Sequence, residues 1–348
     1  MLKKEGEKRV ELSARKKDVL KVVVQKYIKS GEPIGSKSMC DALGGISSAT
    51  IRNEMSSLEE LNLLYHPHTS AGRIPTANGF RFYIDNIMKP EKLSVKQKQL
   101  LDMLLPDANF DKKQAINFAA TALSQATKCT ALVTDETDRQ TKVQKVEMVL
   151  INSNSVLLML ITSNSNVISR KYRFSSLITD EIADAFLRLV NNHITNEVIR
   201  DIQPAFLQTI VANSGQYALD IAPLVSALSE LIAEAGECKL ELFGEANLLS
   251  CANYSVLTAK EIFSLLTSRD EVLNLLEIWD KNSGVILGAD TPYKALENAS
   301  LVVSKYNLDG SQGYIGIIGP TRMDYDSIMP SIEYFADRLS NLGSYTNV

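Results

Sequence analysis

The sequence predicts a multidomain α+β protein whose first domain is a winged helix-turn-helix. Two helical segments joined by a Gly-containing turn, followed by two short apolar runs around a second turn, predict the winged helix. Four strand-like runs follow near the middle of the chain and three more near its end, with helical patterns between them. Separate runs of strands and helices are typical of layers in which helices cover one face of an antiparallel sheet.

The chain is long enough, at 348 residues, for roughly two to three domains. Its 45% hydrophobic and 22% charged residues are typical of a globular protein. It has no apolar run of about 18 residues and no signal-peptide core at its start, so we expect a cytoplasmic protein without membrane spans. The cysteines are scattered without a CxxC pair, which predicts buried thiols rather than disulfides or a zinc site: Cys40, Cys129, Cys238 and Cys251.

Basic residues gather at the N-terminal end of the chain. Residues 1–92 contain 16 Lys and Arg against 11 Asp and Glu, whereas the remainder contains 21 against 30. A net positive charge on residues 1–92 and a net negative charge on the remainder are expected when one domain alone contacts phosphates. The alternative is chance variation, to which the lysine-rich start contributes.

A helix that begins at Ser47 or Ser48 is the centre of the predicted winged helix, because either hydroxyl can cap its first turn. Its apolar stripe has helical spacing and comprises Ile51, Met55, Leu58 and Leu61. Ala49 and Asn53 lie opposite that stripe, with Thr50 and Arg52 beside them. Such a small polar face can enter a major groove, where Arg contacts guanine and Asn contacts adenine. The alternative is an ordinary solvated helix face.

The flanking segments complete the winged helix. Residues 34–43 predict a short helix, joined by a Gly44–Gly45 turn to the helix above. The apolar runs 64–66 and 73–74 flank the turn 67–72, which predicts a hairpin. A helix over residues 13–29, whose basic first turn faces either phosphate or solvent, and a helix from Pro75 onward supply the remaining core.

The rest of the chain alternates between helical and strand-like patterns. After a polar boundary at 90–98, two helical patterns occupy residues 94–127. Strand-like runs then cover 129–134, 143–151, 156–162 and 167–174, and the Asn- and Ser-rich links between the last three predict an antiparallel meander. A mainly helical block, interrupted at Pro204 and Pro223, extends to Trp279. Strands at 285–287, 301–305 and 313–318 precede a final helix over 327–342.

No catalytic constellation is visible in the sequence. His66 and His68 form an H-x-H pair without a third metal ligand at suitable spacing, and His193 lies in a helical pattern. The Gly-rich run 315–322 lacks the Gly-Lys-Ser/Thr of a phosphate-binding loop, so we interpret it as a tight turn. Arg322 in that run either pairs with Asp324 or contacts the DNA-binding head. We therefore expect no enzyme, no cofactor and no metal.

Three segments resemble one known family. The N-terminal segment is SSATIRNEMSSLEELNLLYHPHTSAGRIPTANGFRFYID, the C-terminal one is GYIGIIGPTRMDYDSI, and a weaker one is LELFGEANLL. Together they resemble the heat-inducible transcription repressors of the HrcA family. The matches are spread over nearly the whole chain.

The resemblance implies a domain organisation. It implies a GAF-like α+β domain with an antiparallel sheet, interrupted by a largely helical inserted dimerisation domain. With these boundaries the chain divides into a winged-helix DNA-binding domain (1–92), a first GAF-like part (93–185), the inserted dimerisation domain (186–279) and a second GAF-like part (280–348). The alternative for the helical block is that its stripes are buried within one monomer.

The resemblance also implies a function and partners. It implies a dimeric, sequence-specific repressor of the groE and dnaK heat-shock operons, bound to the CIRCE inverted-repeat operator on double-stranded DNA. It further implies that the GroEL chaperonin modulates the repressor. The alternative hypothesis is a winged-helix regulator controlled by a small-molecule effector in the GAF-like domain. An enzyme is the least favoured class.

The predicted DNA-binding residues lie on three elements. They are Ser47, Ser48, Ala49, Thr50, Arg52 and Asn53 on the recognition helix, His68, Thr69, Ser70 and Arg73 in the wing, and Lys37 on the preceding helix. The two serines and Lys37 are expected at phosphates, the wing residues at phosphates or in the adjacent groove, and the other recognition-helix residues at bases.

Overall fold

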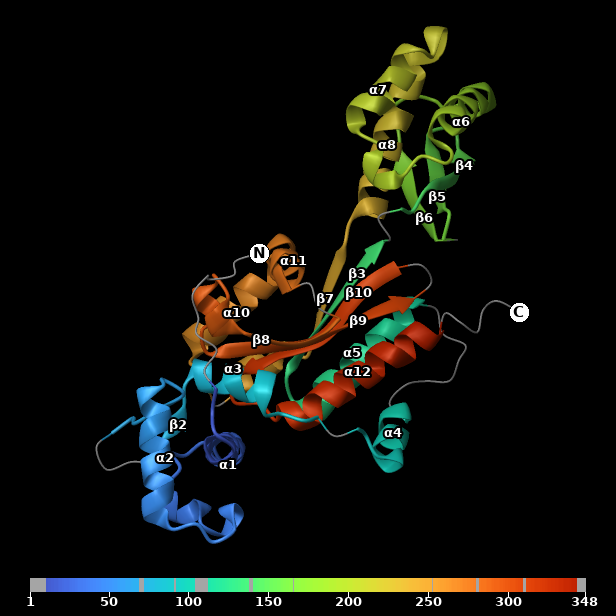
Figure 1. Ribbon diagram of the computed structural model, residues 1–348. Helices are drawn as coiled ribbons and strands as arrows, with labels where there is room; N and C mark the ends of the chain where they lie inside the picture. The colour runs from blue at the N-terminus through green and yellow to red at the C-terminus, as the bar shows by residue number, and fades with distance from the viewer. Residues whose placement is uncertain are drawn as a thin grey trace. The chain divides into compact units, whose positions relative to one another are not determined.

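The computed structural model describes residues 11–68, 72–90, 92–103, 112–137, 140–164, 166–251, 253–279, 282–308 and 311–342. The chain folds into two compact units (Figure 1). The first comprises Met1–Val133, Leu240–Tyr306 and Tyr314–Val348, and the second comprises Thr134–Lys239 and Asn307–Gly313.

The first unit begins with the predicted winged helix. Its elements are α1 (Ala14–Ser30), η1 (Ser36–Met39), η2 (Asp41–Leu43), α2 (Ser48–Glu60), β1 (Leu64–Tyr65), β2 (Ile74–Pro75) and α3 (Ala77–Asn86). Ser13, Ser47 and Thr76 cap the three α-helices with side-chain oxygens, which satisfies first-turn N–H groups. Strands β1 and β2 pair antiparallel and form the predicted wing.

Two details of the predicted helix-turn-helix are wrong. The segment expected as one short helix consists of two 3-10 helices, η1 and η2, separated at Cys40. Leu61, expected in the buried stripe of α2, is the residue after the helix and is 38% exposed. The other three stripe residues, Ile51, Met55 and Leu58, are buried as predicted.

The remainder of the first unit is a sheet with helices on both faces. The strand order is β7 (Lys239–Phe243), β3 (Thr130–Thr137), β10 (Ser311–Pro320), β9 (Ala299–Leu308) and β8 (Ser283–Leu287). Helices α5 (Lys112–Thr127) and α12 (Tyr325–Leu342) lie side by side across one face (Figure 1). On the other face α9 (Ala246–Ser250), α10 (Val256–Thr267) and α11 (Arg269–Trp279) share a buried core with Leu132, Leu301 and Ile318. A short helix, α4 (Val95–Asp102), lies between α3 and α5 in the sequence.

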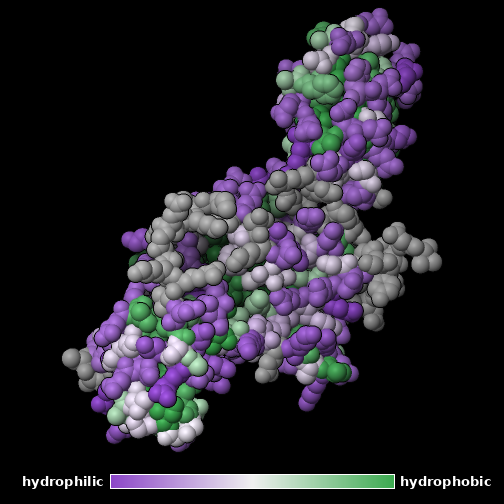
Figure 2. Space-filling model, viewed as in Figure 1, coloured by the Kyte–Doolittle hydropathy of each residue, from purple (hydrophilic) through white to green (hydrophobic). Residues whose placement is uncertain are grey.

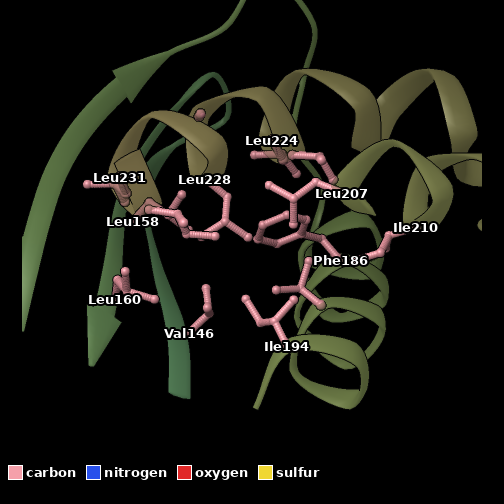
Figure 3. Close-up of a cluster of buried hydrophobic side chains, with 14 of the residues drawn as sticks. Val146, Leu158, Leu160, Phe186, Ile194, Leu207, Ile210, Leu224, Leu228 and Leu231 are labelled. Atoms are coloured by element: carbon pink, nitrogen blue, oxygen red, sulfur yellow. The ribbon is translucent and has the colours of Figure 1, made fainter. Parts of the chain in front are cut away.

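The second unit contains the predicted meander. Strands β4 (Val143–Asn152), β5 (Ser155–Thr162) and β6 (Val167–Arg173) form an antiparallel sheet in this order. Its helical elements are α6 (Asp180–Ile194), η3 (Ile199–Asp201), α7 (Pro204–Ala212), η4 (Gly215–Tyr217) and α8 (Ala218–Gly236). Figure 3 shows side chains of the sheet, such as Leu158, pointing toward Phe186 and Leu228 of the helices. The meander and these helices therefore share one core.

Pro223 does not interrupt the helical block where the sequence predicted a break. It lies inside α8, close to its start, whereas Pro204 begins α7 as predicted. Pro223 is the sixth residue of α8, beyond the first-turn N–H groups that have no intrahelical partner, so it removes one helical hydrogen bond, the one to the Leu219 carbonyl oxygen. The cost of this position is offset by a face of α8 that is buried almost without interruption from Ile221 to Ala235.

The compact units divide the chain differently from the boundaries proposed from the sequence. The boundary between residues 185 and 186 falls inside α6, and α9 to α11 lie in the first unit. The predicted boundaries and the GAF-like topology remain predictions, whereas the winged helix and the α+β layers are confirmed.

In Figure 2, apolar residues appear on the visible face as small groups between hydrophilic ones. Among the described residues no helix is long and apolar enough to cross a membrane.

Candidate nucleic-acid interface

The start of α2 is fixed by its cap and its buried stripe. The Thr50 backbone N–H donates to Ser47 Oγ over 3.2 Å, and the two hydroxyls lie 2.9 Å apart. Ser47 has an extended backbone, as expected at an N-cap. Ile51 and Leu58 are fully buried beneath the helix. These contacts determine which side of the first two turns faces outward.

The outward side carries the predicted base-contacting residues together. Ala49, Arg52 and Asn53 are exposed, and Ser48 and Thr50 are half-buried beside them. Among the described residues no hydrogen bond or ion pair holds the Arg52 side chain. The arrangement therefore presents an exposed cation and an amide on one face of a helix start, where the helix dipole also favours phosphate.

Lys37 lies on the element before the recognition helix. It is exposed on η1, while Ser36 and Met39 of the same turn are buried. Since η1 packs against α2, Lys37 is displayed by the same domain as Arg52.

The structure describes two of the four predicted wing residues, and these two differ in exposure. His68 is exposed, whereas Thr69 and Ser70 lie outside the described residues. The Arg73 side chain pairs with Glu59 of α2 over 2.8 Å and is only 16% exposed. The Arg73 backbone also exchanges two hydrogen bonds of 2.9 Å with Ile34. Arg73 thus connects the base of the wing to α2, a role that the sequence did not reveal because nothing in it links Glu59 to the wing.

Sequence reasoning also missed the residues through which the winged helix contacts the sheet domain of the same unit. Arg81 of α3 donates to Asp290 and, over 3.3 Å, to the Val285 carbonyl oxygen. The Tyr83 hydroxyl donates to Asp326, and Gln25 donates to that hydroxyl over 3.4 Å. Burial, and then the hydrogen bond to Asp326, raise the pKa of Tyr83. The helix from Pro75 onward was expected to supply core, and the polar atoms of its Arg81 and Tyr83 serve this second contact.

Arg322 contacts the winged helix as well. Its guanidinium lies 6.0 Å from the centre of the Tyr27 ring and donates to the Ile28 carbonyl oxygen over 3.5 Å. Of the two hypotheses for this residue, contact with the head is the one that the structure supports.

Comparisons with known proteins identify the family. The model for the "HrcA protein C terminal domain" matches residues 113–329. The model for the "Winged helix-turn-helix transcription repressor, HrcA DNA-binding" matches residues 11–88. The chain belongs to the HrcA family. Its N-terminal domain is accordingly a winged-helix DNA-binding domain of a transcription repressor.

Similar proteins cover almost the entire chain. A heat-inducible transcription repressor HrcA of Clostridioides difficile (strain 630) is 31% identical over 94% of this chain and 98% of its own length. The HrcA repressor of Brevibacillus brevis is 29% identical over 95% of this chain and 98% of its own. The crystal structure of a hypothetical protein matches 97% of this chain with a TM-score of 0.61 at 22% identity, which supports the fold. The named relatives are repressors rather than enzymes.

Proposed function

We propose that this chain is a heat-inducible transcription repressor that binds an inverted-repeat operator as a dimer. The observation that carries the proposal is the exposed Arg52–Asn53 face at the capped start of α2, in a chain of the HrcA family. In this proposal Arg52, Asn53, Ala49 and Thr50 contact base edges, because the first turns of a recognition helix enter the major groove. Ser47, Ser48, Lys37 and the wing residues His68, Thr69, Ser70 and Arg73 contact phosphates.

The proposed operator is the CIRCE element upstream of groE and dnaK operons, and the proposed partner is the GroEL chaperonin. Family membership supports both. Repression would take place in the bacterial cytoplasm on nucleoid DNA. When heat fills the chaperonin with unfolded proteins, less of the repressor would be kept active and transcription would resume.

An inverted repeat is matched by a two-fold symmetric dimer. The second unit offers a surface for dimerisation on the outer face of its meander, which lies outside the range 186–279 that was predicted from the sequence to dimerise. Val149 and Ile151 of β4 and Val167 of β6 are 50%, 49% and 57% exposed. Leu157, which pairs with Val149, and Ile161, which pairs with Val167, are half-buried on the same face. A neighbouring group of apolar side chains of this kind is typical of an interface between protein copies.

The dimer surface can be tested by light scattering. Val149→Lys places a charge on the apolar face and should convert the dimer to a monomer. Val95→Lys is the matched control, since Val95 is 74% exposed on α4, outside the meander and outside the predicted dimerisation domain. A dimer that survives Val149→Lys and Leu157→Lys would place the interface elsewhere.

Fluorescence anisotropy tests DNA recognition directly. A CIRCE-type inverted repeat and a scrambled duplex of equal length are titrated at two salt concentrations. Preference for the repeat that persists at the higher salt would support base recognition, because phosphate contacts alone weaken steeply with salt. Equal, salt-sensitive binding to both duplexes would contradict the proposal.

A further inference from the structure

A cavity of about 330 Å³ lies where the winged helix meets the sheet domain of the first unit. Its walls come from α1, α3, the segment that follows α3, α4 and the region around the start of α12. None of the residues that were predicted to contact DNA lines this cavity. It is therefore separate from the proposed DNA-binding surface.

Four lysines from two segments line the cavity. Lys21 and Lys29 lie on α1 with Gln25 midway between them, so a spacing of four places all three on one face of the helix. Lys89 and Lys92 follow α3 in the chain. All four lysines are exposed, and among the described residues no hydrogen bond or ion pair holds any of their ammonium groups. These ammonium groups are therefore available to a ligand.

Two carboxylates line the cavity as well, and both already have partners. The Ser327 hydroxyl donates to Asp324 over 2.8 Å, and the Tyr83 hydroxyl donates to Asp326. Neither carboxylate forms an ion pair with any lysine that the structure describes. Four ammonium groups against two carboxylates leave an excess of two positive charges on the lining. A hollow with such an excess attracts a counter-ion of the opposite sign.

A neutral residue of the lining adds a further hydrogen-bond donor. The side-chain oxygen of Gln97 on α4 accepts from the backbone N–H and the hydroxyl of Ser94, over 2.9 and 2.8 Å. The amide nitrogen of Gln97 is left to donate, and an ammonium group has donors but no acceptor. Such a set of donors suits the acceptor oxygens of phosphate groups.

We propose that the cavity binds a small molecule with at least two phosphate groups. Lysine binds phosphate as a point charge, and neighbouring phosphates can neutralise the charges that two segments bring together. The volume of the cavity lies at the lower end of the range for small-molecule sites, which fits a compact ligand. Because α1 and α12 both line the cavity, the bound molecule contacts the winged helix and the sheet domain together.

The test uses the full-length protein without DNA, in about 0.15 M chloride, where weak attraction to exposed charges is screened. Pyrophosphate is titrated by isothermal calorimetry, and saturable binding of one equivalent per chain is expected. Lys21→Gln combined with Lys29→Gln should weaken this binding about ten-fold, the scale of two exposed charge contacts. Lys260→Gln combined with Lys294→Gln is the matched control, because both lysines are exposed in the first unit and neither lines the cavity.

Two single variants test the cavity without removing a lysine. Asp324→Asn removes a carboxylate from the lining but keeps an oxygen that can accept from Ser327, so it should tighten pyrophosphate binding about three-fold. Gln25→Glu adds a carboxylate between Lys21 and Lys29 and should weaken the binding by a similar factor. Circular dichroism confirms that each variant is folded, and a gain of affinity cannot arise from a lost fold.

DNA offers the same phosphate chemistry, and anisotropy with the scrambled duplex separates the two sources. The double variant at Lys21 and Lys29 should bind this duplex as tightly as the matched control does. If it loses affinity for pyrophosphate and duplex alike, the lysines serve DNA phosphates and the proposal is overturned.

Three results of the calorimetry would also overturn the proposal. The first is an unaltered protein that binds no pyrophosphate. The second is a folded double variant at Lys21 and Lys29 that binds pyrophosphate as tightly as the matched control. The third is binding that neither Asp324→Asn nor Gln25→Glu changes, because the anion would then lie outside the cavity.

Discussion

One arginine lies on the outer face of α2 and another at the base of the wing, and the two differ in exposure and in pairing. Arg52 is exposed on α2 and held by no other side chain that the structure describes, whereas Arg73 is largely buried against Glu59. An arginine that is free to extend can form paired hydrogen bonds with a guanine edge. One that is already paired must break that contact before it reaches DNA. The two surfaces of the winged helix therefore have different capacities for recognition.

Arg52→Ala is expected to produce the largest change in this comparison. It should cost about 1–3 kcal/mol of operator-binding free energy and relax specificity at the base it contacts. Anisotropy with the operator and single-base variants measures both effects. Lys294→Ala provides a control that removes one exposed charge from the first unit, at a residue outside both the winged helix and the meander. Unchanged operator binding by Arg52→Ala would show that the contacting face is wrongly placed.

Ser47→Ala tests whether α2 must be anchored before its outer face can act. Loss of the hydroxyl that accepts from the Thr50 N–H should lower the free energy of unfolding by about 1 kcal/mol. Chemical denaturation of the full chain measures this change. Ser13→Ala is the matched control, because it removes the corresponding cap from α1. If both variants lose similar stability but only Ser47→Ala loses operator affinity, Ser47 acts at the DNA interface, through its cap or through its proposed phosphate contact.

The difference between the two arginines could not be predicted from the sequence. The spacing of Ile51, Met55 and Leu58 identified the buried side of α2, and hence the exposed side with Arg52 and Asn53. No local pattern connects Arg73 with Glu59, since side-chain pairing across a turn depends on how the hairpin packs. Local periodicity thus predicted the face of one element, but not the contacts between elements.

The same limit applies to the rest of the fold. The Asn- and Ser-rich links correctly predicted the meander of β4, β5 and β6, because hairpins are local. Strand β3 instead lies between β7 and β10, whose residues are more than a hundred positions away. Tyr83 lies on the helix that was predicted to supply core and is fully buried, but its hydroxyl donates to Asp326 near the other end of the chain. Pairings at such separations have no signature in one sequence.

Arg73→Ala is expected to have the smallest effect on DNA affinity. Its two measurements separate a phosphate contact from a structural role. Arg73→Ala should weaken binding to operator and scrambled duplexes alike and flatten the salt dependence, because its proposed DNA contact is to phosphate. A double-mutant cycle with Glu59→Gln should give a coupling of about 0.5 kcal/mol in unfolding free energy, as for a partly exposed ion pair. Affinity lost only for the operator would contradict the phosphate contact. A coupling near zero would contradict the structural role, and Arg73 would then resemble Arg52 in being free to meet DNA.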